Sequence, residues 1–362
     1  MKIPTHTLYY VLCYAWERLD RVKTAPRNVV DATGDDLPQN LLARLLCDSF
    51  ARVRRRGLDR DYVEHSEETR RPRGKIDLAA TARRALRARA GVAVRYEELT
   101  TDVLQNRLVK ATMLRLAALP PGQLDEQLRG RLARFARLMP EVGRAELRDE
   151  LFRRVRIHRN NTDYGFLLSV SRLASARLFT EGADGVTRFR EFDADDPEMG
   201  NLFEAFVRGF LRLECPELGV HKGHRQIRWH DATSTPASPR LQVMKADIFV
   251  PARGGRSVIV EAKCEVKPFD RAGSELKNGH LWQLLAYLTN YARPRSEEVP
   301  PSGVLLYATV GRRFSHAYRL SDHDLKVRSL DLGAPWPELR RDLFLFAREL
   351  GAETGAMIRT AA

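Results

Sequence analysis

The sequence lacks the features of a secreted, membrane-spanning or disulfide-stapled protein. No apolar run approaches the roughly 20 residues of a membrane span, and the N-terminal MKIPTHTLYYVL has neither the apolar region nor the cleavage site of a signal peptide. The four cysteines, Cys13, Cys47, Cys215 and Cys264, are scattered and form no CxxC pair, which argues against a disulfide framework or a zinc site. We therefore expect a cytoplasmic protein that is bound to no membrane.

The sequence also lacks low-complexity tracts and a nucleotide-binding loop. No GxxxxGK[ST] pattern occurs, so the chain shows no P-loop of its own. Its 362 residues are 43% hydrophobic and 30% charged, which is typical of soluble globular proteins. This length is enough for two domains of ordinary size.

Positive charge is concentrated in the first half of the chain. Residues 1–190 hold 37 Lys and Arg against 24 Asp and Glu, whereas residues 191–362 hold 24 against 23. The excess indicates a polyanion or an acidic protein as partner of the first half, or else an Arg-rich coding bias. The local clusters RVRRRG (52–57) and RRPRGK (70–75) favour a partner.

The first half reads as an α+β domain rich in helices. Apolar residues at helical spacing predict helices over 8–19, 37–55, 101–119, 124–138 and 164–179. Short strands are expected around 62–65, 75–78 and 92–96, and the charged SEETRRPRGK (66–75) reads as an exposed hairpin tip or long loop. The acidic run EFDADDPEMG (191–200) suggests a domain boundary, with Asp195 or Asp196 capping the next helix. We therefore expect domains over 1–190 and 191–362.

The second half alternates helices and strands. A helix over 199–213 has a wide apolar stripe with Glu204 beside it. We then expect strands, a second helix and further strands, in the order 226–230, 243–250, 257–264, helix 279–291, 303–310 and 316–320.

Two of these strands carry a group of charged residues. Asp247 lies in the middle of the strand over 243–250, and Glu261 and Lys263 emerge on one face of the next strand, with Ala262 on the other. Two carboxylates and an ammonium are costly in a core unless they are paired. Mg²⁺, which prefers oxygen ligands, would explain the carboxylates. A salt-bridged sheet edge would explain them as well, so the spacing alone leaves both readings open.

The order of elements around these residues resembles the PD-(D/E)xK nuclease fold, whose core is a helix, three strands, a helix and a strand. The matching positions are Asp247, Glu261 and Lys263, with Ala246 in place of the motif's proline. In HLWQLLAY, Gln283 and Tyr287 lie four apart, similar to the QxxxY pair of RecB-like branches. The resemblance implies an α/β restriction-endonuclease-like domain with these two residues beside the catalytic site.

A second resemblance extends over nearly the whole chain. The segments LYYVLCYAW, RGKIDLAAT, LTTDVLQNR with its D-x-x-x-N pattern (102–106), KADIFV, VIVEAKCE and HLWQLLAYL occur in the order found in McrC. McrC is the nuclease subunit of McrBC, a two-component, modification-dependent restriction system. The resemblance implies a Mg²⁺-dependent endonuclease that cuts double-stranded DNA, with Mn²⁺ able to substitute. It also implies a partner, the AAA+ GTPase ring McrB, on which the chain docks and whose GTP hydrolysis it stimulates.

The resemblance also implies a role for each part. Residues 1–190 would form the docking domain, with a hairpin or loop near 60–76 projecting into the pore of the ring. Asp247, Glu261 and the carbonyl of Ala262 would hold Mg²⁺, while Lys263 would position a water molecule. Gln283 and Tyr287 would support the site, and Glu204 would hold a second metal or its water.

Two alternatives stay open at this point. The chain could be a stand-alone RecB-like Mg²⁺ nuclease, or a catalytically inactive adaptor of an AAA+ ring. The complete set of Asp247, Glu261 and Lys263 argues against an inactive site. We expect His221 and His224 to be surface residues rather than a zinc pair.

Overall fold

The computed structural model describes residues 3–17, 37–83, 91–158, 161–181, 186–189, 197–230, 241–264, 276, 278–292 and 299–358. The chain divides into two compact units. Unit 1 comprises Met1–Asp36 with Glu191–Ala362, and unit 2 comprises Leu37–Arg190. The change of unit after residue 190 lies where the sequence suggests a boundary, whereas the first helix, expected in the N-terminal domain, belongs to unit 1. No helix within the described ranges is both long and apolar enough to cross a membrane.

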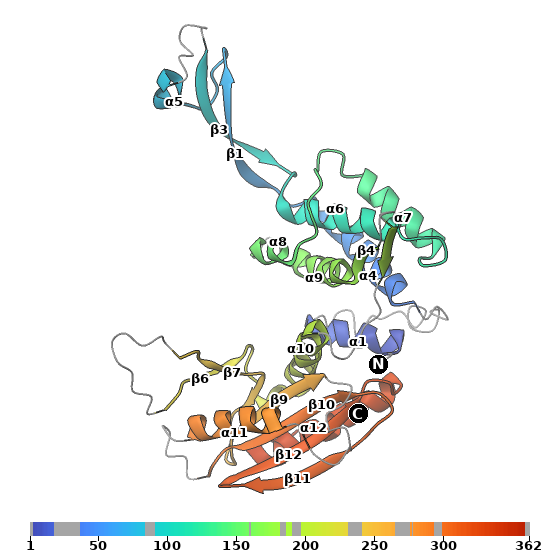
Figure 1. The fold of residues 1–362 in the computed structure, drawn as a ribbon, viewed down its shortest axis with the longest axis vertical. Helices are drawn as coiled ribbons and strands as arrows, with labels where there is room; N and C mark the ends of the chain where they lie inside the picture. The colour runs from blue at the N-terminus through green and yellow to red at the C-terminus, as the bar shows by residue number, and fades with distance from the viewer. Residues whose placement is uncertain are drawn as a thin grey trace. The chain divides into compact units, whose positions relative to one another are not determined.

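Unit 2 is a helical body that carries an antiparallel ribbon (Figure 1). Its helices are α4 (Pro38–Arg56), α5 (Leu78–Arg83), α6 (Leu104–Ala117), α7 (Glu126–Arg137), α8 (Asp149–Arg154) and α9 (Thr162–Arg177), followed by a hairpin of β4 (Leu178–Glu181) and β5 (Val186–Phe189). Four of them, α4, α6, α7 and α9, correspond to predicted helices. The six-residue helix α8 buries only Phe152, so it is too short to produce a helical pattern of apolar residues.

The ribbon consists of β1 (Asp61–Thr69) and β3 (Val92–Thr100), paired from Asp61 opposite Thr100 to Thr69 opposite Val92. Nine residues at about 3.4 Å each give a length of about 30 Å. The expected hairpin near 60–76 differs from this arrangement. Strand β2 (Lys75–Ile76) pairs with β3 and not with β1, so the sheet order is β1-β3-β2. Residues 66–69 of the expected tip are part of β1.

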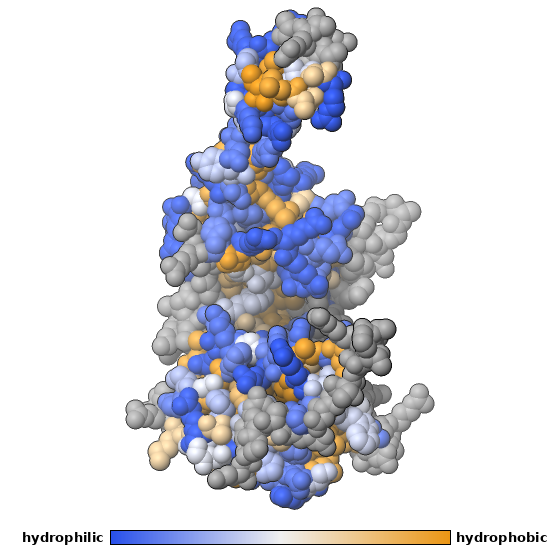
Figure 2. All heavy atoms as spheres, turned by 90° about the vertical axis from the view of Figure 1, so that its left-hand side faces the viewer, coloured by the Kyte–Doolittle hydropathy of each residue, from blue (hydrophilic) through white to orange (hydrophobic). Residues whose placement is uncertain are grey.

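The far end of the ribbon carries α5 (Figure 1) and also β2, which pairs with β3 at Val94 and Arg95. Ile76 and Leu78 are 40% and 66% exposed there, and Figure 2 shows apolar surface at this end, bordered by hydrophilic atoms. Gly74 has φ 71°, and a Cβ atom at this position would lie 2.4 Å from the carbonyl oxygen of Arg95. Only glycine therefore lets the chain turn back so closely against β3.

The root of the ribbon is tied to the helical body by a buried hydrogen-bond network. The Asn106 amide donates to the carbonyl oxygens of Asp59 (3.0 Å) and Thr101 (2.7 Å), which lie just outside β1 and β3. The Tyr164 hydroxyl donates to Asn106 Oδ1 (2.5 Å) and accepts from the Asp59 backbone N–H (3.0 Å). Asn161 also donates to the Asp59 carboxylate (2.9 Å). Both legs of the ribbon are thus bonded to α6, and the β1 leg is bonded to α9 as well.

Unit 1 is built on a five-stranded mixed sheet in the order β11-β12-β10-β9-β8. The strands are β8 (Ile248–Val250), β9 (Val258–Cys264), β10 (Ser302–Thr309), β11 (Ser315–Leu320) and β12 (His323–Asp331). The three central strands are parallel, and β8 and β11 run antiparallel at the edges. Strand β12 is not among the predicted strands, yet it lies between β10 and β11 and joins them into one sheet.

Helices cover both faces of this sheet. Helix α11 (Asn278–Ala292) packs on one face, where Leu284 and Leu288 lie so close to Gly303 of β10 that a Cβ atom there would be 2.9 Å from each. Helix α12 (Trp336–Thr354) follows β12, whose Lys326 forms an ion pair with Glu353 (2.9 Å). A separate two-stranded sheet pairs β6 (Arg225–Ile227) with β7 (Met244–Ala246).

Helix α10 (Pro197–Glu214) explains why α1 (Thr5–Ala15) belongs to unit 1. A Cβ atom at Gly209 of α10 would lie 2.0 Å from the carbonyl oxygen of Tyr14, so the two backbones are in direct contact. The Tyr14 hydroxyl donates to Glu214 (2.8 Å), and its ring centre lies 5.1 Å from that of Phe210. The proposed capping residues Asp195 and Asp196 lie outside the described residues.

Candidate active site

Asp247 is the single residue between β7 and β8, where the extended strand is interrupted. The prediction of one continuous strand over 243–250 is therefore wrong, because β7 pairs with β6 while β8 pairs with β9. The hydrogen bonds of Asp247 explain the interruption. Its side-chain Oδ2 accepts a hydrogen bond from the backbone N–H of Ala262 (2.9 Å), and its backbone carbonyl oxygen accepts one from the Arg208 guanidinium (2.9 Å). Since Ile248 is opposite Val260 in the register, Asp247 is brought next to Glu261.

Glu261 and Lys263 lie on β9 and contact each other. Lys263 Nζ donates to Glu261 Oε1 (2.9 Å) and to Gln283 Oε1 (2.9 Å) on α11. The Gln283 amide in turn donates to the Tyr287 hydroxyl (2.8 Å). The four residues form one hydrogen-bonded chain that reaches from β9 to α11.

The second carboxylate oxygen of Glu261 is less well satisfied. The Glu261 side chain is 2% exposed, and its Oε2 has no hydrogen-bond partner among the residues that the structure describes. A buried carboxylate oxygen without a partner is costly.

Glu204 approaches the same site from α10. It is 8% exposed and forms ion pairs with Arg208 and with His224 Nε2, the latter at 2.9 Å. Ligand atoms of Glu204, His224 and Asp247 all lie within 4.8 Å of one another. His224 is a surface residue as expected, but its ring also joins the acidic group. It stands in the loop before β6, so no sequence pattern links it to Glu204.

Burial and repulsion from neighbouring carboxylates raise the pKa values of Asp247 and Glu261. Burial, followed by repulsion from Glu204, raises the pKa of Asp247 to about 6, although the Ala262 N–H and Lys263 oppose the change. Burial, followed by repulsion from Asp247, raises the pKa of Glu261 to about 7, and the contact with Lys263 only partly offsets it. The site is thus short of positive charge at neutral pH.

These residues fit a divalent cation. Carboxylate oxygens and an imidazole are suitable ligands, Glu261 Oε2 is an unused acceptor among the described residues, and a cation would relieve the repulsion that raises both pKa values. The structure therefore contains a candidate acidic metal site. Its metal, and the role of the Ala262 carbonyl as a ligand, remain predictions.

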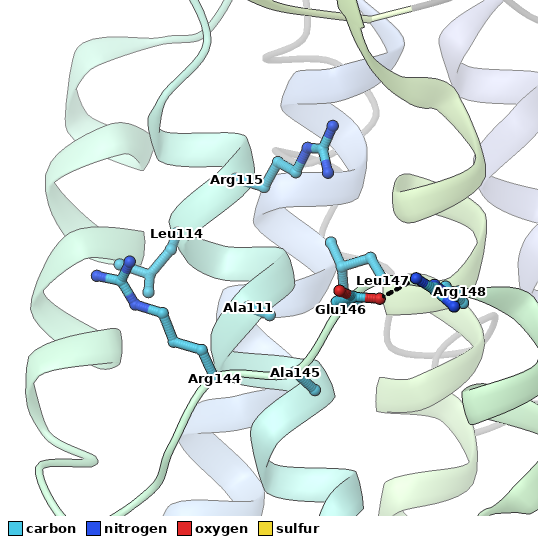
Figure 3. A pocket seen from close by; sticks show the side chains of 8 residues that line it. All are labelled: Ala111, Leu114, Arg115, Arg144, Ala145, Glu146, Leu147 and Arg148. Atoms are coloured by element: carbon cyan, nitrogen blue, oxygen red, sulfur yellow. Dashed lines mark ion pairs between the residues drawn. The ribbon is translucent and has the colours of Figure 1, made fainter. Parts of the chain in front are cut away.

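A pocket with a volume of about 500 Å³ lies in unit 2, away from these residues. Figure 3 shows Glu146 turned toward Arg148, with which it forms an ion pair (2.6 Å). The other lining residues are Ala111, Leu114, Arg115, Arg144, Ala145 and Leu147. Since its single carboxylate is paired with a guanidinium, this pocket offers no pair of acids for metal-assisted chemistry.

Comparison with known proteins identifies the family. Residues 5–308 match the model of the McrBC 5-methylcytosine restriction system component. The chain belongs to this McrBC family. It is also similar to the Type IV methyl-directed restriction enzyme EcoKMcrBC of Escherichia coli K12, with 26% identity over 344 residues, 94% of this chain and 96% of that protein.

Two solved assemblies are similar to this member of the McrBC family. One is a refined half-complex from the tetradecameric assembly of Thermococcus gammatolerans McrB AAA+ hexamers with bound McrC, at 19% identity and a TM-score of 0.45, covering 93% of this chain and 76% of that one. The other is the McrBC complex of the same organism, at 21% identity and a TM-score of 0.40, covering 58% of each chain.

Proposed function

We propose that this chain is the DNA-cutting subunit of a McrBC-type restriction system, a Mg²⁺-dependent endonuclease that hydrolyses phosphodiesters. The observation that carries the proposal is the convergence of Asp247, Glu261 and Lys263 at one edge of the sheet, within a family of restriction-system components. A salt-bridged sheet edge accounts for these contacts less well, because it leaves Glu261 Oε2 without a partner among the described residues.

The order of elements supports a PD-(D/E)xK core. Helix α10 comes first, then strands up to the antiparallel pair β8–β9, then α11, and then β10 parallel to β9. Asp247 immediately precedes β8, and Glu261 and Lys263 lie toward the carboxyl end of β9. Ligands of open α/β sheets commonly bind at the carboxyl ends of parallel strands.

In the proposed mechanism, Asp247, Glu261 and the Ala262 carbonyl would hold the cation, and Glu204 and His224 would add a carboxylate and an imidazole beside it. When bound, the cation supplies Lewis-acid assistance to phosphodiester hydrolysis.

The remaining residues orient the reacting groups. Lys263 is fixed between Glu261 and Gln283, so its ammonium is held where it can orient the attacking water and offset the charge that develops on the phosphate. Tyr287 fixes the Gln283 amide, which keeps the amide oxygen directed at Lys263. DNA cutting should persist when Mn²⁺ replaces Mg²⁺, since both ions bind oxygen ligands.

We further propose that the chain docks on an AAA+ GTPase ring through unit 2. The solved half-complex from Thermococcus gammatolerans has McrC bound to McrB AAA+ hexamers. In the present chain, unit 2 holds most of the net positive charge and carries the ribbon. In this proposal the ribbon is the element that projects into the ring, and double-stranded methylated DNA is the substrate of the assembly.

The test is cleavage of a methylated DNA duplex by the chain with its McrB-type GTPase, GTP and Mg²⁺. Lys263→Ala should reduce cutting at least about 100-fold while GTPase stimulation persists. Lys326→Ala is the matched control, because Lys326 forms an ion pair with Glu353 of α12 and should leave cutting unchanged. Normal cutting by Lys263→Ala would refute the assigned site. Cutting by the chain alone, without ring or GTP, would favour the stand-alone nuclease instead.

A further inference from the structure

The two faces of the β1–β3 ribbon differ in chemistry. Side chains alternate between the faces of a strand, so the register defines two sets. One face carries the opposite pairs Tyr62–Leu99, Glu64–Glu97, Ser66–Arg95 and Glu68–Ala93, and we call the part formed by the first two pairs the acidic–apolar face. The reverse face is formed by the opposite pairs Val63–Glu98 and His65–Tyr96.

The reverse face is occupied by contacts within the chain. The rings of His65 and Tyr96 stack with their centres 5.4 Å apart, and His65 Nε2 lies 3.9 Å from Glu98. The Arg73 guanidinium covers the Tyr96 ring at 3.8 Å and forms an ion pair with Glu67 (3.2 Å). The rings of His65 and Tyr96 and the charges of Arg73 and Glu67 therefore have partners already.

The acidic–apolar face is unfavourable for the chain by itself. Glu64 and Glu97 are directly opposite each other, and like charges in this position destabilise a strand pair. Arg95 offsets the repulsion between Glu64 and Glu97 only weakly, because its closer ion pair is with Asp77 (2.8 Å) rather than with Glu64 (3.9 Å). The neighbouring pair, Tyr62 and Leu99, is 64% and 48% exposed. A partner surface with cations and an apolar depression would relieve both costs.

We propose that the acidic–apolar face is the docking surface for a cationic part of the AAA+ ring. Tyr62 and Leu99 bury their side chains against apolar atoms of the ring, and Glu64 and Glu97 meet Lys or Arg side chains around them. This inference rests on the proposed docking function. Charge complementarity selects this occupant, because the opposed carboxylates favour a cationic surface and the exposed Tyr62–Leu99 pair favours apolar atoms beside it.

The experiment measures the Kd of the full-length chain for its McrB-type ring, assembled with a non-hydrolysable GTP analogue. Glu64→Lys/Glu97→Lys should weaken binding about tenfold or more, and should remove the salt dependence of the remaining affinity. This variant keeps one like-charged pair in the ribbon, so its folding stability should change little. Tyr62→Ala/Leu99→Ala should weaken binding by a similar factor.

Two further variants separate docking from folding. Val63→Ala/Glu98→Lys changes the same kinds of residue on the reverse face and should alter the Kd less than about twofold. Glu97→Gln removes the repulsion, so it should raise the Tm of the chain while it weakens binding, which a purely structural role would not produce.

The outcomes distinguish the inference from the function on which it rests. If the wild-type chain binds no ring, the docking function fails. If the wild-type chain binds but variants of both faces weaken binding equally, or neither does, the choice of face is wrong and the docking function stands.

Discussion

Three features of its surroundings make the ionised Glu261 side chain unfavourable in the metal-free chain. It is 2% exposed, it lies beside the second carboxylate Asp247, and one of its oxygens lacks a hydrogen-bond partner among the described residues. Lys263 compensates only the other oxygen. The metal-free chain is therefore strained electrostatically at this residue, and the strain has measurable consequences for stability and for metal affinity.

Stability of the metal-free chain should fall as the pH rises from about 4, the ordinary carboxyl range, through the raised pKa values of about 6 and about 7. The folded state binds more protons than the unfolded chain in this window, so the free energy of unfolding decreases with pH. Thermal unfolding in EDTA between pH 5 and pH 8 checks this. Mg²⁺ competes with the same protons, so calorimetric Mg²⁺ affinity should increase over that range.

Glu261→Gln is the corresponding variant. It removes a buried negative charge and should raise the stability of the metal-free chain at pH 8 by about 1–3 kcal/mol, while it abolishes the stabilisation by Mg²⁺. Asp324→Asn provides a control, since this acid is paired with Arg256 and Arg319 away from the site. If Glu261→Gln lost stability in EDTA, or if it kept the full stabilisation by Mg²⁺, the role of Glu261 as a metal ligand would be contradicted.

At this scale the sequence predicts much of the candidate site. The alternation of Glu261 and Lys263 on one strand and the four-residue spacing of Gln283 and Tyr287 depend only on local geometry, and the contacts agree with both. The contact of His224 with Glu204 depends on how a loop folds back on α10, and no local pattern encodes that.

The pairing of α1 with α10 is the feature at the scale of elements that most changes the division of the chain. Local periodicity predicts both helices well but says nothing of their contact, because the residues that meet are nearly 200 positions apart in the chain. The apolar pattern predicts β9, β10 and α11. Strand β12 is not among the predicted strands, although its buried residues alternate with partly exposed charged ones, as in a half-buried strand.

Gly209→Ala should destabilise unit 1 by roughly 1–3 kcal/mol, because the added Cβ atom would meet the Tyr14 backbone at 2.0 Å and backbone atoms cannot rotate away. Gly200→Ala in the same helix is the matched control. A Cβ atom there meets nothing within 4 Å, so the change should be neutral or stabilise α10 by up to about 1 kcal/mol. Chemical denaturation measures both. Equal stability of the two variants would mean that α1 does not pack on α10 in solution.

At the scale of the whole molecule, the two units carry separable tasks in the proposed function. The metal site is formed within unit 1, and the ribbon belongs to unit 2. The sequence predicts the boundary near residue 190 from its acidic run, but it cannot predict that residues 3–17 return to unit 1.

Removal of the ribbon tip tests this separation. Since Thr69 is opposite Val92, replacing residues 70–91 by Asn-Gly would close the ribbon with a two-residue turn and leave all nine pairs of β1 and β3 in place. We expect GTPase stimulation to fall at least about tenfold, while Mg²⁺ binding at unit 1 is unchanged. A steady-state GTPase assay and calorimetry measure the two. Full stimulation by this variant would show that the tip is dispensable, and lost Mg²⁺ binding would show that the units are coupled.

The network around Asn106 has a mechanical consequence for the ribbon. At the root, Asp59 on the β1 side is bonded to Asn106 of α6 and to Tyr164 of α9, and Thr101 on the β3 side is bonded to Asn106. The ribbon is therefore attached rigidly at its root and is not hinged there. A sideways push at its tip becomes torque on α6 and α9, and the lever arm is the full length of the strand pair.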